Sequence, residues 1–456
     1  MKMKIIWCIA INFCLITSSN FCSAQNIAAG GSQSLSLCTN NTVQGWGYNN
    51  LGQLGTGTPG VLTLPTTTLF NGMTAVAMGV GNSLTIKNDS TVWAAGDNGL
   101  GQLGNNSVIS SSTPVQVFGL SNVIAIAVGT LNSLALKSDS SVWAWGDNGY
   151  GQLGNGNNTG SLIPVQAINL TGVIAVAAGN YHSIALKGDS TVWAWGYALG
   201  NGQNTTTNAP QQISGLSGII AIAGGNTFSL ALKSDGTVWA WGSNNEGELG
   251  NNTTINSITP VQTLNLTGIT AIYAGVYHSL AIKNDSTVWA WGYNANGQLG
   301  DNSTIDRHAP VIVNLLTGVT EVSAGYNHSM ALKSNGTVWA FGLNSYGELG
   351  NGSFLDSHIP LQTAPLCTTS GVTEIFYQPD INIYPNPALG TFTIKVNNGS
   401  KNAQLQIFNN LRQTIYSKNN ISTQTINVEF LAPGIYFVKV LDGEKHYSKK
   451  LVVEHD

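Results

Sequence analysis

Short apolar stretches alternate with Gly-rich or polar turns along most of this chain, and the pattern repeats. In one unit the apolar stretches lie at residues 123–127, 133–137, 142–145 and 164–167. Stretches of this length, in which large side chains alternate with alanine, are typical of β-strands. Each unit therefore predicts four short strands. No long amphipathic helical pattern interrupts them.

A phrase close to Val-Trp-Ala-Trp-Gly, followed by Gly-Gln-Leu-Gly, marks the third predicted strand of each unit. Its last glycine recurs at intervals of 46 to 50 residues, at Gly47, Gly96, Gly146, Gly196, Gly242, Gly292 and Gly342. A period near 50 residues made of short strands is the signature of a β-propeller with one blade per repeat, and seven blades can close a ring. We therefore predict an all-β fold with a seven-bladed β-propeller over residues 25–367.

The repeat pattern stops after the seventh unit. Residues 368–379 have mixed polar character and are predicted to form a linker. In residues 380–456, alternating strands are separated by turns rich in Pro, Asn and Gly, and this arrangement predicts a small β-sandwich.

The N-terminus has the pattern of a secretory signal peptide over residues 1–24. Two lysines precede an apolar stretch at 5–16, and small residues then lead to a predicted cleavage between Ala24 and Gln25. The apolar stretch has about 12 residues, which is too short for the roughly 20 residues of a membrane-spanning helix.

Two cysteines remain after signal cleavage, because Cys8, Cys14 and Cys22 leave with the signal peptide. Cys38 lies in the first repeat and Cys367 lies just beyond the last. A closed ring makes the first and last blades neighbours, and exported proteins commonly use paired cysteines, so we predict a disulfide between them. The strand at 27–30 resembles the end of a repeat whose beginning is missing, which suggests that the last repeat completes the first blade.

Charge is scarce and unevenly distributed. Only 8% of residues are charged, and residues 25–376 contain 7 Lys and Arg against 15 Asp and Glu, a net charge of −8. The remaining C-terminal residues have a net charge of +2. A protein that neutralises phosphates needs a basic surface, so the acidic propeller is not expected to bind nucleic acid.

The repeats resemble those of the regulator-of-chromosome-condensation family. The resemblance is clearest at residues 179–196, Gly-Asn-Tyr-His-Ser-Ile-Ala-Leu-Lys-Gly-Asp-Ser-Thr-Val-Trp-Ala-Trp-Gly, and extends from about residue 26 to 363. It implies a seven-bladed propeller. The family's nuclear founder acts on a small GTPase and chromatin, but an acidic, exported protein is expected to meet neither. Another secreted bacterial member inhibits β-lactamases by covering them with one propeller face, so fold alone does not name the partner.

The tail resembles the type A C-terminal sorting domain of the type IX secretion system of Bacteroidetes. The resemblance rests on Tyr384-Pro385-Asn386-Pro387, on Gly434-Ile435-Tyr436, and on basic residues near the end of the chain. It implies interaction with that secretion machinery, passage across the outer membrane and removal of the tail. The cargo is then released or attached to surface lipopolysaccharide.

Histidine and serine recur at adjacent repeat positions and are candidates for chemistry. His182, His278 and His328 occupy one position, and a serine follows that position in all seven repeats. They would make a ring of metal ligands or bases only if they lined the central channel, and a nucleophile is needed once rather than seven times. We favour structural roles in which the histidines bond to the backbone of turns. We predict no catalytic residue, metal site or cofactor.

Three other recurring features have alternative readings. The Trp pairs, as at Trp143 and Trp145, could stack on carbohydrate, but residues two apart in a packed strand favour core positions. Asp97-Asn98-Gly99 faintly resembles a calcium loop but lacks the later bidentate Glu. The six lysines that end the second strands are expected to be solvated.

The segments after Gly-Gln-Leu-Gly differ between repeats, and a rigid scaffold that presents variable loops is typical of a binding surface. The segment after Gly300 holds Asp301, Asp306, Arg307 and His308, including the only Arg of the propeller, a residue type favoured at interface hot spots. Its charges could instead pair with one another.

We predict a secreted or surface-attached, non-catalytic recognition protein that binds a protein or glycan. The alternatives are an enzyme with a shallow axial site, acting for example on a polysaccharide, and an inhibitor of another secreted enzyme.

Overall fold

The computed structural model describes residues 24–197, 199–203, 205–367, 381–384, 388–389, 391–396, 403–409, 413–421, 423–442 and 445–454. The chain divides into two compact units, Met1–Thr369 and Ser370–Asp456. The predicted signal peptide up to residue 23, the predicted linker and Pro385–Pro387 of the sorting motif lie outside the described residues. No helix in the described ranges is long and apolar enough to cross a membrane.

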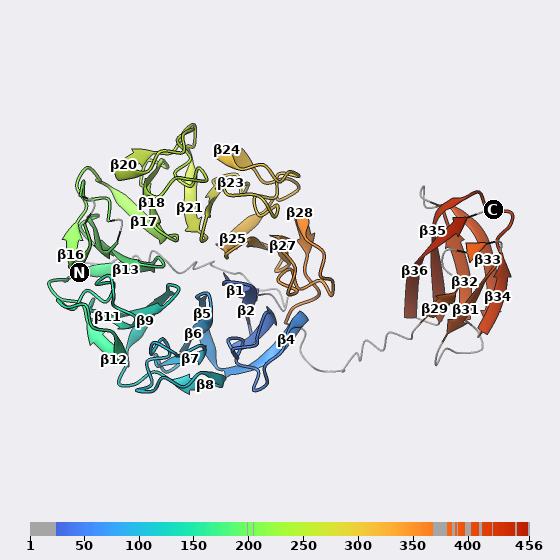
Figure 1. Cartoon of the computed structure of the whole chain (residues 1–456), viewed down its shortest axis with the longest axis horizontal. Coiled ribbons are helices and arrows are strands. Elements are labelled where there is room, and N and C mark those ends of the chain that lie inside the picture. The colour runs from blue at the N-terminus through green and yellow to red at the C-terminus, as the bar shows by residue number, and fades with distance from the viewer. Residues whose placement is uncertain are drawn as a thin grey trace, which may run out of the picture. The chain divides into compact units, whose positions relative to one another are not determined.

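The first unit is a ring of seven four-stranded antiparallel sheets, each made of four consecutive strands (Figure 1). The innermost strands are β1 (Ala24–Ala29), β5 (Met73–Met78), β9 (Val123–Val128), β13 (Val173–Ala178), β17 (Ile219–Gly224), β21 (Ile269–Ala274) and β25 (Val319–Ala324). The second strands are β2 (Gln33–Cys38), β6 (Asn82–Lys87), β10 (Asn132–Lys137), β14 (His182–Lys187), β18 (Phe228–Lys233), β22 (His278–Lys283) and β26 (His328–Lys333).

The outer half of each blade has the same regularity. The third strands are β3 (Thr42–Gly47), β7 (Val92–Gly96), β11 (Val142–Gly146), β15 (Val192–Gly196), β19 (Val238–Gly242), β23 (Val288–Gly292) and β27 (Val338–Gly342). The outermost strands are β4 (Leu62–Asn71), β8 (Ser111–Gln116), β12 (Ser161–Gln166), β16 (Thr207–Gln212), β20 (Ser257–Gln262), β24 (Arg307–Ile312) and β28 (Ser357–Gln362).

The predicted seven-bladed propeller is confirmed, but the expected sharing of a blade between the two ends of the chain is wrong. β1 pairs with β2 in the first sheet, and β28 pairs with β27 in the last. The residues just before Ile27 extend the strand back to Ala24, so the first repeat supplies its own innermost strand. The ring is therefore closed by side chains between blades rather than by strand exchange.

The alternation of large and small side chains fills the space between neighbouring sheets. Leu84 and Ile86 of one blade pack with Ala135 and Trp145 of the next in one buried cluster. Alanine lets the sheets approach while the large side chains fill the gap, so each interface reaches the close packing of a protein interior. This requirement explains why the same apolar residues return in every unit.

One polar junction recurs between blades and explains three of the repeated residues together. The carbonyl oxygen of Gln152, in Gly-Gln-Leu-Gly, accepts hydrogen bonds from Trp195 Nε1 (2.8 Å) and Ser183 Oγ (2.8 Å) of the next blade. The carbonyls of Gln102 and Glu248 accept the same pair of bonds. Buried polar groups must be paired, so this one acceptor satisfies two donors inside an otherwise apolar interface.

The last glycine of Gly-Gln-Leu-Gly is required at this junction. Gly154 has a φ of +70°, a conformation that residues with a Cβ rarely adopt. A Cβ there would lie 2.7 Å from Trp195 Nε1. The glycine therefore lets the loop backbone pass against the indole of the next blade.

The seam between the last and first blades uses the same junction and adds further bonds. The carbonyl of Glu348 accepts hydrogen bonds from Trp46 Nε1 (2.8 Å) and Ser34 Oγ (3.0 Å). Ala29 N donates to Ser323 Oγ at 2.9 Å, and Cys38 forms a disulfide with Cys367. The interface between the last and first blades thus uses the same interaction as other blade interfaces, and a disulfide also links it covalently.

A buried carboxyl group also lies at the seam. Ile27 N donates to Glu321 Oε1 at 3.3 Å. Burial raises the pKa of Glu321 to about 8, and the hydrogen bond from Ile27 only partly opposes that rise. The group is therefore mostly protonated at neutral pH, which avoids the cost of burying an unpaired charge.

The second unit contains two sheets around one core. Its strands are β29 (Ile381–Tyr384), β30 (Ala388–Leu389), β31 (Thr391–Val396), β32 (Ala403–Phe408), β33 (Thr414–Ile421), β34 (Thr423–Asn427), β35 (Gly434–Asp442) and β36 (Lys445–Glu454). The order is β29-β31-β34 in one sheet and β30-β36-β35-β32-β33 in the other. Phe392 of the first packs with Leu405 and Val438 of the second, as a β-sandwich requires.

We predict that the disulfide contributes strongly to the stability of the propeller. Replacing Cys38 and Cys367 by Ser should lower the free energy of unfolding by up to about 5 kcal/mol, because the bond closes a very long loop in the unfolded chain. Urea unfolding followed by Trp fluorescence reports the propeller alone, since no Trp lies after residue 339. Reductant should weaken the wild type and leave the double variant unchanged. Two free thiols in the exported, non-reduced protein would contradict the prediction.

Candidate functional site

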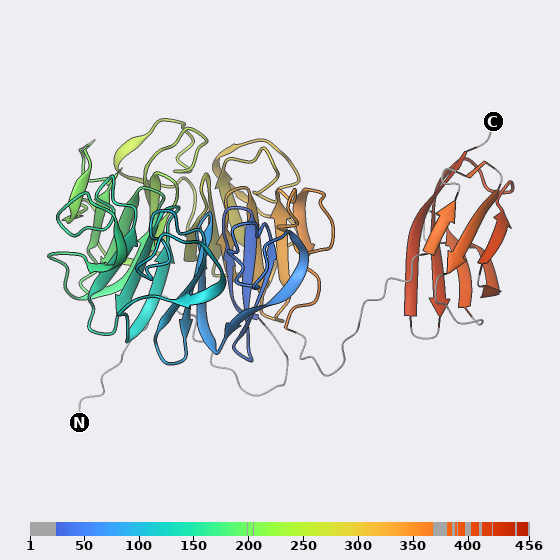
Figure 2. The same cartoon turned by 60° about the horizontal axis from the view of Figure 1, so that its bottom comes forward.

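Two kinds of connection meet at one end of the ring. In an antiparallel four-stranded sheet, the connections from first to second strand and from third to fourth strand lie at the same end. We call this end the loop face and the opposite end, which has the short turns between second and third strands, the turn face. Figure 2 shows the ring obliquely, turned by 60° from the view of Figure 1. The variable segments after Gly-Gln-Leu-Gly join third to fourth strands and so belong to the loop face.

A buried asparagine organises each variable loop except that of the fourth blade, where the connection from Gly196 to Thr207 is four residues shorter than that from Gly146 to Ser161 in the third blade. Asn294 Nδ2 donates to the carbonyls of Ser303 (3.1 Å) and Ile305 (3.1 Å), and its Oδ1 accepts from Leu299 N (3.0 Å). The equivalent residues are Asn49, Asn98, Asn148, Asn244 and Asn344. These bonds restrain each loop before any partner binds, which reduces the entropy lost on binding.

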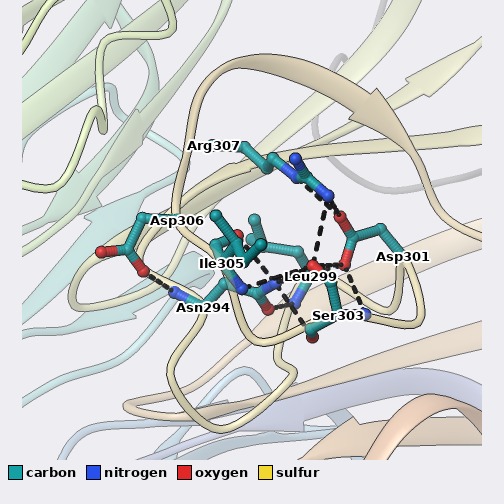
Figure 3. A network of polar contacts seen from close by, with 7 residues as sticks. All are labelled: Asn294, Leu299, Asp301, Ser303, Ile305, Asp306 and Arg307. Carbon is teal, nitrogen blue, oxygen red and sulfur yellow. Dashed lines mark hydrogen bonds and ion pairs between the residues drawn. The ribbon is translucent and has the colours of Figure 1, made fainter.

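The predicted binding loop is held together by its own charges (Figure 3). Arg307 Nε donates to Asp301 Oδ2 at 2.7 Å, and Arg307 Nη2 donates to Ser303 Oγ at 3.2 Å. Burial alone raises the pKa of Asp301, but hydrogen bonds from Ser303 and Arg307 outweigh it and hold the pKa below its usual value. The Asp301 side chain is only 6% exposed, against 34% for Arg307. The guanidinium is thus largely used within the loop.

The other two predicted residues differ: Asp306 bonds to the protein, whereas His308 is exposed. Asp306 Oδ1 accepts a hydrogen bond from Asn294 N at 2.6 Å. His308 lies on β24 beside Gly247 of the preceding blade, where a Cβ would come within 2.6 Å of His308 Cδ2. Burial and the nearby charge of Asp306 raise the pKa of Glu246. The structure therefore places Asp301 and Asp306 in the loop and Arg307 and His308 at the start of β24. Asp301, Asp306 and Arg307 bond within the protein, whereas His308 is exposed.

Exposed aliphatic side chains at the tips of these loops were not recognised from the sequence. Eleven residues after the buried asparagine, four loops carry a large apolar residue whose carbonyl accepts from that asparagine. The four are Ile109 (75% exposed), Ile255 (73%), Ile305 (64%) and Leu355 (77%). The available signal was an apolar residue at a constant distance within an otherwise polar segment.

Tyrosines gather on the inner part of the loop face, which the sequence reading also missed. Eight of the chain's 14 tyrosines lie in its connections, and they touch in pairs. The ring-centroid distances are 5.0 Å for Tyr48–Tyr346, 5.1 Å for Tyr150–Tyr181, 5.8 Å for Tyr150–Tyr197, 5.4 Å for Tyr277–Tyr326 and 6.2 Å for Tyr277–Tyr293. Their repeat positions hold other residues in the remaining blades, so no single repeat reveals the cluster.

A hollow with a volume of about 460 Å³ opens among some of these tyrosines. Its lining comes from the first, second, third and last blades and includes Tyr48, Tyr326, Tyr346, Leu51, Asp97 and Asn327. We call this hollow the basin. It lies on the loop face over the seam of the ring, because it includes residues of both the first and the last blade.

The three histidines are interblade contacts rather than a reactive ring. His278 Nε2 lies 2.9 Å from Ser329 Oγ of the next blade, and that hydroxyl donates to the carbonyl of Gln298. The serine can therefore only accept from the imidazole, which places the histidine proton on Nε2. His182 and His328 contact Ser229 and Ser34 in the same way. The structural role agrees with the favoured interpretation, but the partner is a serine rather than turn backbone.

The Trp pairs divide between core and surface. The second Trp of the phrase, as at Trp145, is fully buried, whereas Trp143 is partly exposed and Lys137 Nζ lies 5.6 Å from its ring centroid. The same cation–π contact occurs for all six repeat lysines. The expectation that these lysines are simply solvated is therefore wrong: each covers an indole on the turn face, because the exposed ring attracts the ammonium group.

The propeller axis offers little for chemistry. A narrow channel of about 70 Å³ is lined by the ends of the innermost strands, including Gly79, Gly129, Gly225, Gly275 and Gly325. None of its described lining residues is titratable. Among the residues with described positions, no group of three or more His, Cys, Asp or Glu could hold a metal ion.

Comparison with protein families identifies both units of the chain. Residues 164–383 match the RCC1-like domain, and residues 89–136 and 139–186 match the regulator of chromosome condensation (RCC1) repeat. A second description of that repeat matches residues 123–152. Residues 382–454 match the secretion system C-terminal sorting domain. None of the curated proteins matches the chain.

Solved structures with the same propeller fold share low sequence identity with this chain. Human WBSCR16 is 24% identical with a TM-score of 0.61, and the match covers 69% of this chain and 88% of that one. Prp20p of Saccharomyces cerevisiae, described with its binding to Gsp1p and histones, is 23% identical with a TM-score of 0.63, covering 74% and 87%. At such identities the likeness shows the fold and not the partner.

We predict that the buried histidines destabilise the propeller in acid. Burial lowers the pKa of His278 to about 3, whereas its pKa in the unfolded chain is about 6.5. Below pH 6.5 this histidine is therefore protonated in the unfolded chain but stays neutral in the folded one. Stability is thus fully present above pH 6.5 and falls as pH drops. His278→Asn, the residue of two other repeats, should cost about 1 kcal/mol at pH 7 through the lost hydrogen bond. When the pH is lowered from 6.5 to 5, the free energy of unfolding of this variant should decrease by about 2 kcal/mol less than that of the wild type.

Urea unfolding at both pH values, followed by Trp fluorescence, measures this difference. Asn132 occupies the equivalent position of the third blade and does not titrate, so Asn132→Ala is the matched control. It should lower stability equally at the two pH values. An equal pH dependence for His278→Asn and the wild type would disprove the assignment.

Proposed function

Because the chain is a propeller of RCC1 repeats followed by a secretion system C-terminal sorting domain, we propose that it is a secreted or surface-attached recognition protein that binds a protein or glycan through its loop face. The sorting domain indicates export by the type IX secretion system to the cell surface or outside. In this proposal the tail is removed after export, and the propeller is released or attached to surface lipopolysaccharide. Neither a GTPase nor nucleic acid is proposed as its partner.

The difference between the two faces is the observation that carries the recognition role. The turn face repeats one turn with minor changes, in which Asp139 Oδ1 accepts from Ser141 N at 3.0 Å and Lys137 covers an indole. The loop face instead varies from blade to blade, is rigid, and exposes aliphatic and aromatic side chains. Large exposed apolar groups on a fixed scaffold mark interaction surfaces in soluble proteins.

Recognition without catalysis fits the described residues better than the alternative of an axial enzyme. The axial channel is narrow, and its described lining has no acid, base or nucleophile that could act on a substrate. Inhibition of another secreted enzyme stays a special case of recognition, in which the bound protein is that enzyme. The exposed aliphatic residues at the loop tips suit such a protein partner.

The predicted loop keeps a place in this proposal, with a changed division of roles. Arg307 and Asp301 bond to each other, so their contribution is to hold the loop in its binding conformation. Ile305 at the tip is 64% exposed and makes the contact with the partner. Arg307→Ala and Asp306→Ala are then expected to weaken binding by loosening the loop.

We predict that deletion of residues 381–456 abolishes export and spares the propeller. The truncated protein should accumulate in the periplasm and be absent from the medium and cell surface. The propeller is a compact unit of its own, so its thermal unfolding by Trp fluorescence should match that of the full chain. Fusing residues 381–456 to a periplasmic reporter should send the reporter out of the cell. Normal appearance of the truncated protein outside the cell would refute the role of the tail.

We predict that the loop tips contribute most of the binding to a protein partner. In pull-downs from the extracellular and surface fraction with the full chain, Ile255→Ser combined with Ile305→Ser should weaken retention of a specific component by about 30-fold, as hot-spot truncations of roughly 2 kcal/mol do. Asp285→Ala, on the turn face, is the matched control and should bind normally. If the turn-face variant loses the component and the tip variant keeps it, the loop face is the wrong surface.

A further inference from the structure

The basin has the dimensions of a small-ligand site rather than of a protein interface. Its volume of about 460 Å³ falls within the roughly 300 to 1,000 Å³ typical of such sites. It lies over the seam, where the disulfide and the Glu348 junction join the last blade to the first. The walls that carry Tyr48 and Tyr346 are therefore fixed relative to each other before a ligand arrives. Such preorganisation reduces the entropy lost when a ligand binds.

The charges around the basin disfavour an anionic ligand. All six lysines of the propeller lie at the turn face, and its only arginine, Arg307, is paired with Asp301 in the loop after Gly300. The described lining contains one carboxylate, Asp97, and no cationic side chain. An acidic surface repels phosphate, sulfate and uronate groups. The ligand that matches this lining is neutral and supplies hydrogen-bond donors to a carboxylate.

The tyrosines supply flat apolar surface next to polar groups. Tyr346 is 42% exposed, and its ring meets that of Tyr48 edge to face with centroids 5.0 Å apart. A tyrosine ring offers an apolar face and a hydroxyl that forms hydrogen bonds. A pyranose ring is complementary, because it has C–H groups on its faces and hydroxyl groups at its edge.

Asp97 is oriented by the protein and keeps acceptor capacity for a ligand. Its Oδ2 accepts from Gln102 Nε2 at 2.9 Å, and its Oδ1 accepts from Gly99 N at 3.3 Å and Ser110 Oγ at 3.3 Å. A carboxylate has about four lone-pair positions, so these bonds fix the group without exhausting it. A carboxylate held in this way can accept hydrogen bonds from sugar hydroxyls.

Gly81 keeps the basin open. A Cβ there would lie 3.3 Å from Asp97 Cβ and 3.4 Å from Leu51 Cδ1, so a longer side chain would enter the hollow between them. The equivalent position carries Leu131 in the third blade and Asn327 in the last, so the backbone accepts larger residues there. The absence of a side chain in the second repeat is thus what leaves room beside Asp97.

We propose that the basin binds one or two rings of a neutral carbohydrate. One sugar face packs against Tyr346 and Tyr48, and the sugar hydroxyls donate to Asp97. The inference rests on the proposed recognition function and deepens it, because it names the ligand class and places glycan binding at the seam rather than at the rim loop of Arg307.

The test is titration of the full chain with neutral sugars, followed by saturation-transfer NMR and tyrosine fluorescence. The probes are glucose, galactose, mannose, N-acetylglucosamine and their β-linked disaccharides. At least one should bind the wild type, and Tyr346→Ala and Gly81→Leu should weaken it by about tenfold or more. Tyr346→Phe keeps the ring and should bind within about threefold of the wild type. Asp97→Asn should also weaken binding.

Tyr150→Ala is the matched control, because Tyr150 occupies the same repeat position as Tyr346, is 43% exposed and does not line the basin. It should bind sugar normally, and Trp fluorescence should show that every variant is folded. Failure of all probes to bind the wild type, or equal binding by Tyr346→Ala and Gly81→Leu, would overturn the proposal. Competition for the basin by a protein in place of a sugar would overturn it as well. Recognition by the loop face would still stand if the loop-tip variants lost their partner, so the two proposals can fail separately.

Discussion

The rest of this propeller depends on one interaction between neighbouring blades, in which a single backbone carbonyl accepts two hydrogen bonds. The carbonyl oxygen of Gln152 accepts one hydrogen bond from Trp195 Nε1 and another from Ser183 Oγ, and the same arrangement appears at several other interfaces. Because the acceptor belongs to a loop of one blade and the donors belong to strands of the next, the bonds fix the angle between blades. Glycine after the leucine is needed for the loop to approach the indole. One physical constraint therefore explains why Gly-Gln-Leu-Gly, serine and tryptophan recur together.

The same constraint prepares the loop face for recognition. The Gly-Gln-Leu-Gly segment is tied to the next blade, and the buried asparagine before it draws the following loop inward. What remains free to vary is the outer surface of each loop. Evolutionary change can therefore alter the exposed side chains without disturbing the ring, which is the property that makes rigid scaffolds suitable for binding.

Buried titratable groups limit the pH range of this construction from both sides. The histidines are neutral in the folded state and take up protons in the unfolded state, so the free energy of unfolding decreases as pH falls below about 6.5. Glu321 behaves in the opposite way, because its raised pKa means that stability is lost as pH rises from about 4.5 towards 8. These opposite dependences place the greatest stability of the propeller between mildly acidic and neutral pH.

The sequence by itself determined the number of blades, the strands within them and the nature of the tail, because these follow from local periodicity and from motifs repeated many times. It also identified Gly-Gln-Leu-Gly and the loops after it, although it left open whether Arg307 pairs within its loop. Tertiary structure alone decided that the histidines contact serines of the next blade, that the lysines cover indoles, and that the first blade is complete. It also brought Tyr48, Asp97 and Tyr346 to one basin, although Tyr48 and Tyr346 lie at opposite ends of the propeller sequence. Those contacts depend on which surfaces meet when the ring closes, and closure joins residues that no periodic pattern along the chain relates to one another.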